Sequence, residues 1–445
     1  MMKKVLILGA GMVVKPIVTY LLEKEYHVTV ATRTKSKADT MIGNHPNGTS
    51  LAWTVDDEAT LDSLVQEHDL TVSLLPYAYH VMVARLCIKH KKNMVTTSYV
   101  KPEMKALNAE AKAAGIIILN ELGLDPGIDH MSAMRIIDHV HEKGGKIEEF
   151  YSFCGALVAP EVEKNPFNYK FTWAPKGVVM ASNNDGKYLR RGEVKYIPTE
   201  DLFKDPIKVD VPGVGPLEVY PNRDSLPYIE LYGIPETKTM FRGTFRYEKW
   251  CEVLDGMKAL NLLSYDKFNM DGLTYAEFLA KTSGLEDINN LKNAVAEKIG
   301  GDESGYIREA LGWLGFFSDE AVDRLEDSPF EVTSDVMISK MMIGPEERDM
   351  VVLQHTFVAD YNGEKEVIRS TMLDYGSQQT DTSIARTVAL PAACGVDMIL
   401  QEQISATGVH IPVIPDIYNP ILDQLETMDI KMEEEFGLSM EKNIK

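Results

Sequence analysis

Cysteine is rare in this sequence. The four cysteines, Cys87, Cys154, Cys251 and Cys394, lie far apart and form no C-x-x-C pair. This spacing argues against structural zinc, and reduced cysteines suit the cytoplasm. We therefore predict a cytoplasmic protein without a metal centre.

Positive charge is also scarce. The 445 residues include 46 Lys and Arg against 67 Asp and Glu, which gives a formal net charge of -21. Nucleic acids and anionic membranes need a cationic surface, so we expect neither as a partner. An anionic small molecule must instead find a local basic pocket.

Long apolar runs are missing as well. The apolar stretch within residues 1–9 is too short for a signal peptide, and the sequence offers no transmembrane candidate. With 44% hydrophobic and 25% charged residues, the composition is that of a soluble globular protein. The length predicts two or three domains.

Short apolar strands alternate with amphipathic helices from Val5 to Asn120. The strand-like runs are Val5–Leu8, Val28–Ala31, Leu51–Trp53, Leu70–Leu75, Met94–Thr97 and Ile116–Asn120. This alternation predicts an α/β domain with a doubly wound parallel sheet. Ligands of such sheets bind at the carboxyl ends of the strands.

The first strand opens a dinucleotide-binding motif. Gly9 allows a tight turn, and Gly11 lets the backbone approach a pyrophosphate at the helix N-terminus. Val14 replaces the third glycine of the motif, and Pro16 fits the first turn of the following helix. Alone, this motif is a weak signal.

The second strand ends at Thr32-Arg33, where an NAD-type fold usually has an acid. A guanidinium beside the hydroxyls of Thr34 and Ser36 suits a phosphate, which favours NADP. The alternative is that Arg33 is an ordinary solvated surface residue.

Later strands also end in polar or turn residues. Pro76-Tyr77 follows the fourth strand, Ser98-Tyr99 the fifth, and Asp125 the sixth, within the loop Asn120–His130. We expect Asp125 and Asp129 at the ligand crevice. Alternatively both aspartates cap a helix, and Ser98 and Tyr99 cap the helix that begins near Lys101.

The pattern changes after Gly145. Irregular strands and an aromatic-rich loop predict a second, α+β domain that contains Arg223, Arg242 and Arg246. Arg242 and Arg246 share one face if Thr239–Tyr247 is a strand. Arginines among aromatics favour a carboxylate pocket, and ordinary surface arginines are the alternative.

The rest of the chain first turns helical. Residues 251–347 have a helical pattern, which predicts a helical insert. Val351–Tyr361 and Val367–Asp374 then flank Asn362-Gly363, which predicts a hairpin. The remainder, interrupted by Pro391, is predicted to be helical and then irregular, and to pack back on the first domain.

Eight strings of residues, taken in order, resemble the saccharopine dehydrogenase family of the glutamate-forming type. They are Gly9–Val13, Ser73–Tyr77, Thr97–Tyr99, Glu121–His130, Asn165–Trp173, Tyr220–Ser225, Arg242–Tyr247 and Glu347–His355. The resemblance runs nearly end to end. One departure is that Ala156 and Val158 stand where the family often has glycine and proline, which we expect to affect the flexibility of a loop.

The resemblance implies three domains and a homodimer. Residues 1–125 and 385–445 would form a Rossmann NADP-binding domain. Residues 126–250 and 348–384 would form an α+β substrate-binding and dimerisation domain, and residues 251–347 its small helical insert.

The resemblance also implies a reaction: hydride transfer between NADP, or NAD, and saccharopine, yielding L-glutamate and 2-aminoadipate 6-semialdehyde. Implied substrate contacts are Ser98, Tyr99, Asp125, Arg223, Thr244, Phe245 and Arg246. Implied cofactor contacts are Gly9, Ala10, Gly11, Met12, Val13, Thr32, Arg33, Leu75, Pro76, Leu124 and Pro126. Asp125, Tyr99 and Cys154 are the candidates for acid–base catalysis.

Two other functions are alternatives. A related reductive-condensation enzyme, such as a carboxynorspermidine dehydrogenase, would need fewer carboxylate contacts, and Arg223 with Arg246 argues against it. A non-catalytic NADP-binding regulator would not need Asp125.

Overall fold

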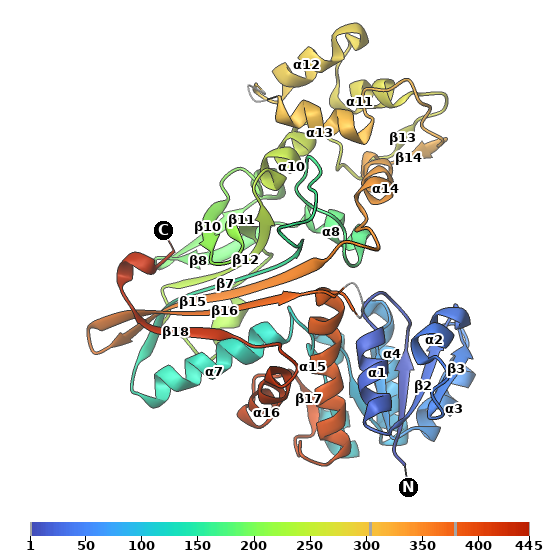
Figure 1. Cartoon of the computed structure of the whole chain (residues 1–445), viewed down its shortest axis with the longest axis vertical. Helices are drawn as coiled ribbons and strands as arrows, with labels where there is room; N and C mark the ends of the chain where they lie inside the picture. Colours follow the sequence, from blue (N-terminus) through green and yellow to red (C-terminus); the bar gives the residue numbers. More distant parts are fainter. Residues whose placement is uncertain (1, 302–304, 378–380, 445) are drawn as a thin grey trace. The chain divides into compact units, whose positions relative to one another are not determined.

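The structure is a computed structural model that describes residues 2–301, 305–377 and 381–444 (Figure 1). The chain forms two compact units. Unit 1 comprises Met1–Gly145 and Ser370–Glu434, and unit 2 comprises Lys146–Arg369 and Glu435–Lys445.

Unit 1 is built on a seven-stranded sheet with the order β17-β6-β5-β4-β1-β2-β3. Within the described residues, neighbouring strands of this sheet run parallel. Its strands are β1 (Lys4–Leu8), β2 (His27–Thr32), β3 (Gly48–Ala52), β4 (Leu70–Ser73), β5 (Asn93–Val95), β6 (Ile117–Leu119) and β17 (Gly408–His410). The predicted doubly wound α/β fold is confirmed.

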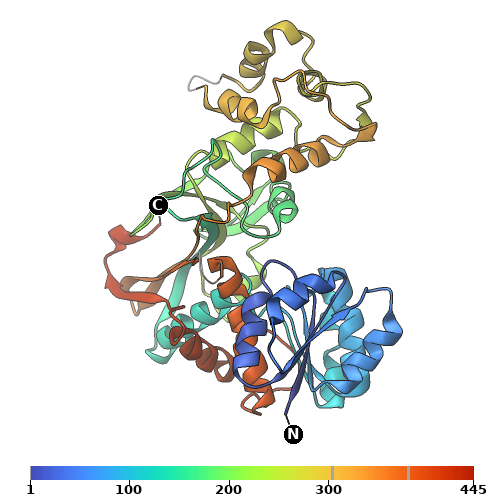
Figure 2. The ribbon, with the colours of Figure 1, turned by 45° about the vertical axis from the view of Figure 1, so that its right-hand side comes forward.

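Helices lie on both faces of this sheet (Figure 2). The helices of unit 1 are α1 (Lys15–Glu23), α2 (Lys35–Ile42), α3 (Glu58–Glu67), η1 (Tyr77–Tyr79), α4 (His80–His90), α5 (Pro102–Lys105), α6 (Asn108–Ala114), α7 (Ile128–Glu142), α15 (Ser383–Leu400) and α16 (Pro415–Glu426). Leu6 and Leu8 of β1 are buried in one core cluster with Val83 of α4 and Ala111 of α6. The strand order reverses between β1 and β4, which is where such folds bind ligands.

The C-terminal segment packs back on unit 1 as far as Glu434. β17 pairs with β6, and Asp397 of α15 accepts a hydrogen bond of 2.5 Å from the hydroxyl of Tyr26. The prediction that this segment becomes irregular was wrong, because it contains α16, β17 and β18 (Glu433–Leu438). Pro391 does not end α15 either, since burial along the helix offsets the missing amide donor.

Among the described residues, α15 is the one helix with the length and hydropathy of a membrane span. Because 83% of it is buried inside the structure, it has the character of a core helix and gives little support for a span.

Unit 2 contains most of a nine-stranded mixed sheet with the path β10-β11-β12-β7-β15-β16-β18, and β8 and β9 pair beside β12. Its strands are β7 (Lys146–Val158), β8 (Gly186–Arg190), β9 (Glu193–Ile197), β10 (Ile207–Val211), β11 (Gly215–Pro221), β12 (Thr239–Tyr247), β15 (Asp349–Tyr361) and β16 (Glu364–Tyr375), followed by β18. Phe150, Phe153 and Phe245 lie fully buried in this sheet. The α+β prediction is confirmed.

The predicted hairpin is present as β15 and β16, which are neighbours in the sheet. Asn362 and Gly363 have φ angles of 59° and 100°. Positive φ at both central residues is what a tight hairpin turn requires.

Helices dominate the region predicted as an insert. Its elements are α10 (Trp250–Ala259), β13 (Phe268–Asn269), α11 (Tyr275–Ser283), η3 (Ile288–Asn290), α12 (Leu291–Lys298), α13 (Tyr306–Leu314), β14 (Glu326–Asp327) and α14 (Pro329–Met341). The other helices of unit 2 are α8 (Pro175–Ala181), η2 (Thr199–Asp201), α9 (Pro227–Leu231) and η4 (Met440–Lys442).

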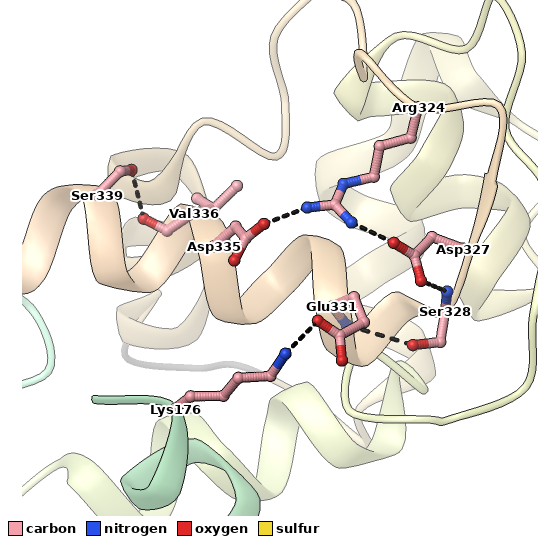
Figure 3. Close-up of polar contacts among 8 residues, drawn as sticks. All are labelled: Lys176, Arg324, Asp327, Ser328, Glu331, Asp335, Val336 and Ser339. Carbon is pink, nitrogen blue, oxygen red and sulfur yellow. Dashed lines mark hydrogen bonds and ion pairs between the residues drawn. The ribbon is translucent and has the colours of Figure 1, made fainter. Parts of the chain in front are cut away.

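Polar contacts fix the start of α14 (Figure 3). The hydroxyl of Ser328 accepts a hydrogen bond from the amide of Glu331, and the Glu331 carboxylate lies 2.6 Å from Nζ of Lys176. Arg324 bridges Asp327 and Asp335. These contacts tie α14 to α8 and to the preceding loop.

The compact units do not divide the chain where the domains were predicted. Residues 126–145 belong to unit 1, because α7 packs on α16 there, and residues 435–445 belong to unit 2. The division into three domains remains a proposal.

Candidate active site

The turn after β1 has the geometry of a dinucleotide-binding motif. Gly9 has a φ of 110°, and a Cβ at this position would lie 2.9 Å from the carbonyl oxygen of Leu74. A Cβ on Gly11 would meet nothing within 4 Å, so this backbone is open to a ligand. α1 begins without a side-chain cap, which leaves its first amide groups available to an anion.

The other predicted cofactor contacts differ in exposure. Met12 is 53% exposed and Val13 half-buried, whereas Ala10 is buried. Thr32 ends β2, and Arg33 is exposed directly after it, without an ion pair to any described residue. Beyond β4, Leu75 is half-buried and Pro76 exposed, whereas Leu124 and Pro126 are buried in the loop before α7.

The loops after β5 and β6 bring two predicted catalytic residues together. The hydroxyl of Tyr99 donates a hydrogen bond of 2.8 Å to Oδ1 of Asp125, and both residues are half-buried. Asp129, in contrast, is buried and accepts a hydrogen bond of 2.7 Å from the amide of Gly127. The expectation that Asp129 stands open at the crevice was therefore wrong, because its carboxylate holds the start of α7.

Glu121 connects these two loops, a role that was not predicted from the sequence. Its carboxylate accepts a hydrogen bond of 2.8 Å from the amide of Val100 and lies 2.7 Å from Nε2 of buried His130. Its φ of 58° is unusual for a side chain of this size. The single residue Glu121 thus fixes both the Tyr99 loop and the Asp125 loop.

His80 is a second residue that sequence reasoning missed. Its Nδ1 lies 2.8 Å from Oγ of Ser73, and its Nε2 lies 2.8 Å from Oγ of Ser98. Burial lowers the pKa of His80 to about 4, so the ring is neutral near pH 7. The predicted substrate contact Ser98 is therefore held by a neutral imidazole.

In unit 2, Arg246 lies in a cage of aromatic rings. Its guanidinium carbon is 4.8 Å from the ring centre of Tyr169, 5.3 Å from that of Trp250 and 5.8 Å from that of Tyr220. The side chain is buried, Nη1 donates a hydrogen bond of 2.8 Å to the carbonyl of Phe245, and Nε has no partner. Ring faces stabilise a cation without neutralising it.

Glu218 is the cross-strand neighbour of Arg246 in β11. Its carboxylate accepts a hydrogen bond of 3.2 Å from the amide of Cys251 at the start of α10. Within the described parts of the chain Arg246 has no ion pair, so the guanidinium is suited to an anionic ligand.

Other predicted substrate contacts lie along the same strands. Thr244 is in register with both Cys154 of β7 and Tyr220 of β11. Phe245 is fully buried, and a Cβ on Gly155 would lie 2.7 Å from its Cβ, so only glycine fits there. The predicted acid–base candidate Cys154 is buried.

The departures at Ala156 and Val158 do not lie in a loop. Both belong to β7, paired with Val351 and Asp349 of β15. The expectation of altered loop flexibility at these positions was wrong, because both residues lie within the long strand β7.

The remaining arginines are arranged differently. Arg242 is buried, with its guanidinium carbon 4.1 Å above the ring of Tyr228, as expected for the face that it shares with Arg246. Arg223 is exposed after β11 and has a φ of 57°. Within the described residues, no group of three or more His, Cys, Asp or Glu could hold a metal ion.

Residues 5–119 match the family described as the saccharopine dehydrogenase NADP binding domain, and residues 123–430 match the saccharopine dehydrogenase C-terminal domain. The chain belongs to the saccharopine dehydrogenase family. The NADP binding domain and the C-terminal domain of the family are thus both present, one after the other along the chain.

Relatives match nearly the whole chain. The saccharopine dehydrogenase (NADP+, L-glutamate-forming) of Schizosaccharomyces pombe is 38% identical to this chain. The alignment covers 98% of this chain and 99% of the Schizosaccharomyces pombe protein. The mitochondrial alpha-aminoadipic semialdehyde synthase of Bos taurus is 39% identical over 96% of this chain, which spans 47% of that longer protein.

A solved structure of the family has the same fold. Apo saccharopine dehydrogenase (L-Glu forming) from Saccharomyces cerevisiae aligns with a TM-score of 0.90 at 34% identity, covering 98% of this chain and 99% of the other.

Proposed function

We propose that this chain is an oxidoreductase of lysine metabolism that interconverts saccharopine with L-glutamate and 2-aminoadipate 6-semialdehyde, using NADP. The observation that carries the proposal is the match to a relative of that name over 98% of this chain and 99% of the relative. In the reductive direction, the amine of glutamate condenses with the aldehyde and water leaves. The resulting imine is protonated at nitrogen, and its carbon takes a hydride from NADPH, which gives the secondary amine of saccharopine and NADP+.

The basic residues of unit 2 support a substrate with several carboxylates. Saccharopine carries three, and a chain with a net charge of -21 repels them unless local cations hold them. We assign one carboxylate of the substrate to Arg246 in its aromatic cage, and a second carboxylate to the exposed Arg223. Thr244 and Phe245 border Arg246 on β12 and complete this set.

The residues around the β1 turn fit NADP. Gly9 and Gly11 leave room for the pyrophosphate beside the uncapped N-terminus of α1, with Ala10, Met12 and Val13 along the turn. Arg33 is assigned the ribose phosphate. Leu75, Pro76, Leu124 and Pro126 are assigned to the nicotinamide side. When bound, NADP supplies or accepts the hydride.

Proton transfer is assigned to the Tyr99–Asp125 pair. Condensation and imine formation move protons to and from the substrate nitrogen and the departing oxygen. The hydrogen bond between Tyr99 and Asp125 orients the carboxylate, which is a suitable acid–base group. Buried Cys154 is the alternative group.

A turnover assay tests the proposal. The purified chain should oxidise NADPH only when L-glutamate and the semialdehyde are both present, and mass spectrometry should identify saccharopine as the product. No oxidation would favour a non-catalytic NADP-binding regulator. Faster oxidation with a diamine in place of glutamate would favour a carboxynorspermidine dehydrogenase.

We also propose a cytoplasmic homodimer with three domains that acts without nucleic acid or membrane partners. The formal charge and the resemblance to the family support this assembly. Light scattering on the purified chain tests the dimer, and fluorescence microscopy of a tagged chain tests the location.

A further inference from the structure

A chain of hydrogen bonds connects the end of β4 with the loop after β5, entirely within unit 1. Ser73 is the last residue of β4, His80 the first of α4, and Ser98 follows β5. Both contacts of the imidazole measure 2.8 Å. Ser73 and His80 are buried, and Ser98 is half-buried, so the chain leads from the core towards a more open side chain.

The backbone of Ser98 is fixed as well. Its amide donates a hydrogen bond of 3.3 Å to Oγ1 of Thr96, and its carbonyl accepts one of 3.2 Å from the amide of Glu121. With the backbone and Oγ both held, the remaining freedom of Ser98 is the direction of its hydroxyl hydrogen.

The hydrogen bonds favour one arrangement of protons. A neutral imidazole has one N–H donor and one acceptor nitrogen. Within the described residues, His80 is the only hydrogen-bond partner of the buried Ser73 hydroxyl. A Ser73 that accepted from Nδ1 would leave its own hydrogen without an acceptor, which is costly in the core. Ser73 therefore donates to Nδ1, and the proton of His80 lies on Nε2.

We infer that Ser73 and His80 are positioning residues that make Ser98 a hydrogen-bond donor to a carboxylate oxygen of the substrate. Because Nε2–H donates to Oγ of Ser98, the Ser98 hydrogen is directed away from the imidazole and towards a ligand. This inference rests on the proposed function, in which Ser98 contacts the substrate. A Ser98 hydroxyl that donates its hydrogen favours an anionic group of the substrate over an ammonium group at that position.

Two substitutions of His80 separate this role from mere filling of the core. The amide of glutamine reaches the position of Nε2 and can still donate to Ser98, whereas that of asparagine reaches only the position of Nδ1. We expect His80→Asn to raise the KM for saccharopine about tenfold, and His80→Gln no more than about threefold. The KM for NADP should stay within about twofold in both. Equal effects of the two substitutions would overturn the inference.

Ser73→Ala tests the relay without touching the ring. It should raise the KM for saccharopine in the parent but not in a Ser98→Ala background, because the effect passes through Ser98. Thr71→Val is the matched control, since Thr71 is also buried on β4, two residues away. Fully additive effects of Ser73→Ala and Ser98→Ala would overturn the inference.

NMR of histidine labelled at its ring nitrogens gives a measurement without turnover. We expect the signals of an Nε2–H tautomer for His80, assigned by their absence in His80→Gln. An Nδ1–H tautomer in a chain that turns over saccharopine would overturn this inference alone. A parent without saccharopine turnover would overturn the proposed function, and the substrate part of this inference with it.

Discussion

The hydroxyl of Tyr99 and Oδ1 of Asp125 lie 2.8 Å apart in a hydrogen bond that joins the loops after two neighbouring strands. Glu121 holds both loops through its contacts with Val100 and His130. The orientation of the Asp125 carboxylate is therefore set before any substrate arrives.

Asp125→Asn is expected to lower kcat roughly a hundredfold, because the amide cannot take up a proton. The KM for NADP should change by no more than about threefold. Tyr99→Phe should have a smaller effect, since it removes only the orienting hydroxyl. Steady-state kinetics with saccharopine measure both, and Tyr77→Phe, at an exposed tyrosine, is the control. Full activity of Asp125→Asn would remove Asp125 from the mechanism.

Arg246→Ala should raise the KM for saccharopine about ten- to a hundredfold, as expected for loss of one charge-assisted hydrogen bond. Arg223→Ala should act in the same direction. The KM for NADP should stay nearly constant in both. Arg348→Ala, at a half-buried arginine paired with Glu161, controls for the loss of a positive charge alone. Equal losses for cofactor and substrate would contradict the assignment.

Arg33 governs the choice of cofactor in our proposal. Arg33→Ala should reduce the preference for NADP over NAD about ten- to a hundredfold, with little change in the use of NAD. Lys37→Ala removes a charge from the same exposed segment and should leave the preference intact. Turnover with each cofactor decides the matter. A parent that prefers NAD, or an unchanged ratio in Arg33→Ala, would refute the role.

His80 should make the stability of the fold sensitive to acid. Burial lowers its pKa from 6.5 to about 4 in the folded chain. Between these two values the unfolded chain binds a proton that the folded chain does not, so the free energy of unfolding falls as the pH falls. The total loss is about 3 kcal/mol for a shift of this size.

Thermal unfolding measured from pH 7 to pH 4 tests this prediction. In His80→Gln the melting temperature should fall less steeply with acid than in the parent. His141→Gln, at an exposed histidine of α7, is the control. An identical pH dependence in His80→Gln and the parent would show that His80 is not the group responsible.

Local signals in the sequence predicted the fold well. The apolar run Val5–Leu8, the turn Asn362-Gly363 and the strand Thr239–Tyr247 all lie where their composition placed them. Each depends on neighbours in the sequence, so period and turn chemistry were sufficient. Pro391 was misjudged because its effect on a helix depends on burial of the whole helix, which is a property of the tertiary structure.

The sequence pointed to candidate site residues but not to the contacts that hold them. Tyr99 and Asp125 were both candidates, but their hydrogen bond spans 26 positions, and no local pattern reveals it. His80 and Glu121 were missed because they contact residues of other elements, namely the loop after β5 and, for Glu121, helix α7. The position of the Glu121 side chain also depends on a positive φ, which cannot be predicted from a glutamate in the sequence.

The pairing of β17 with β6 has a consequence for synthesis on the ribosome. A nascent chain that has emerged only as far as Gly145 contains β1 to β6, but β6 has an unpaired edge until Gly408–His410 appear. Exposed strand edges promote association with other chains. The nascent chain can therefore associate with other chains while the residues between β6 and β17 are being translated. A chaperone that covers the edge of β6 during this time would improve the yield of folded protein.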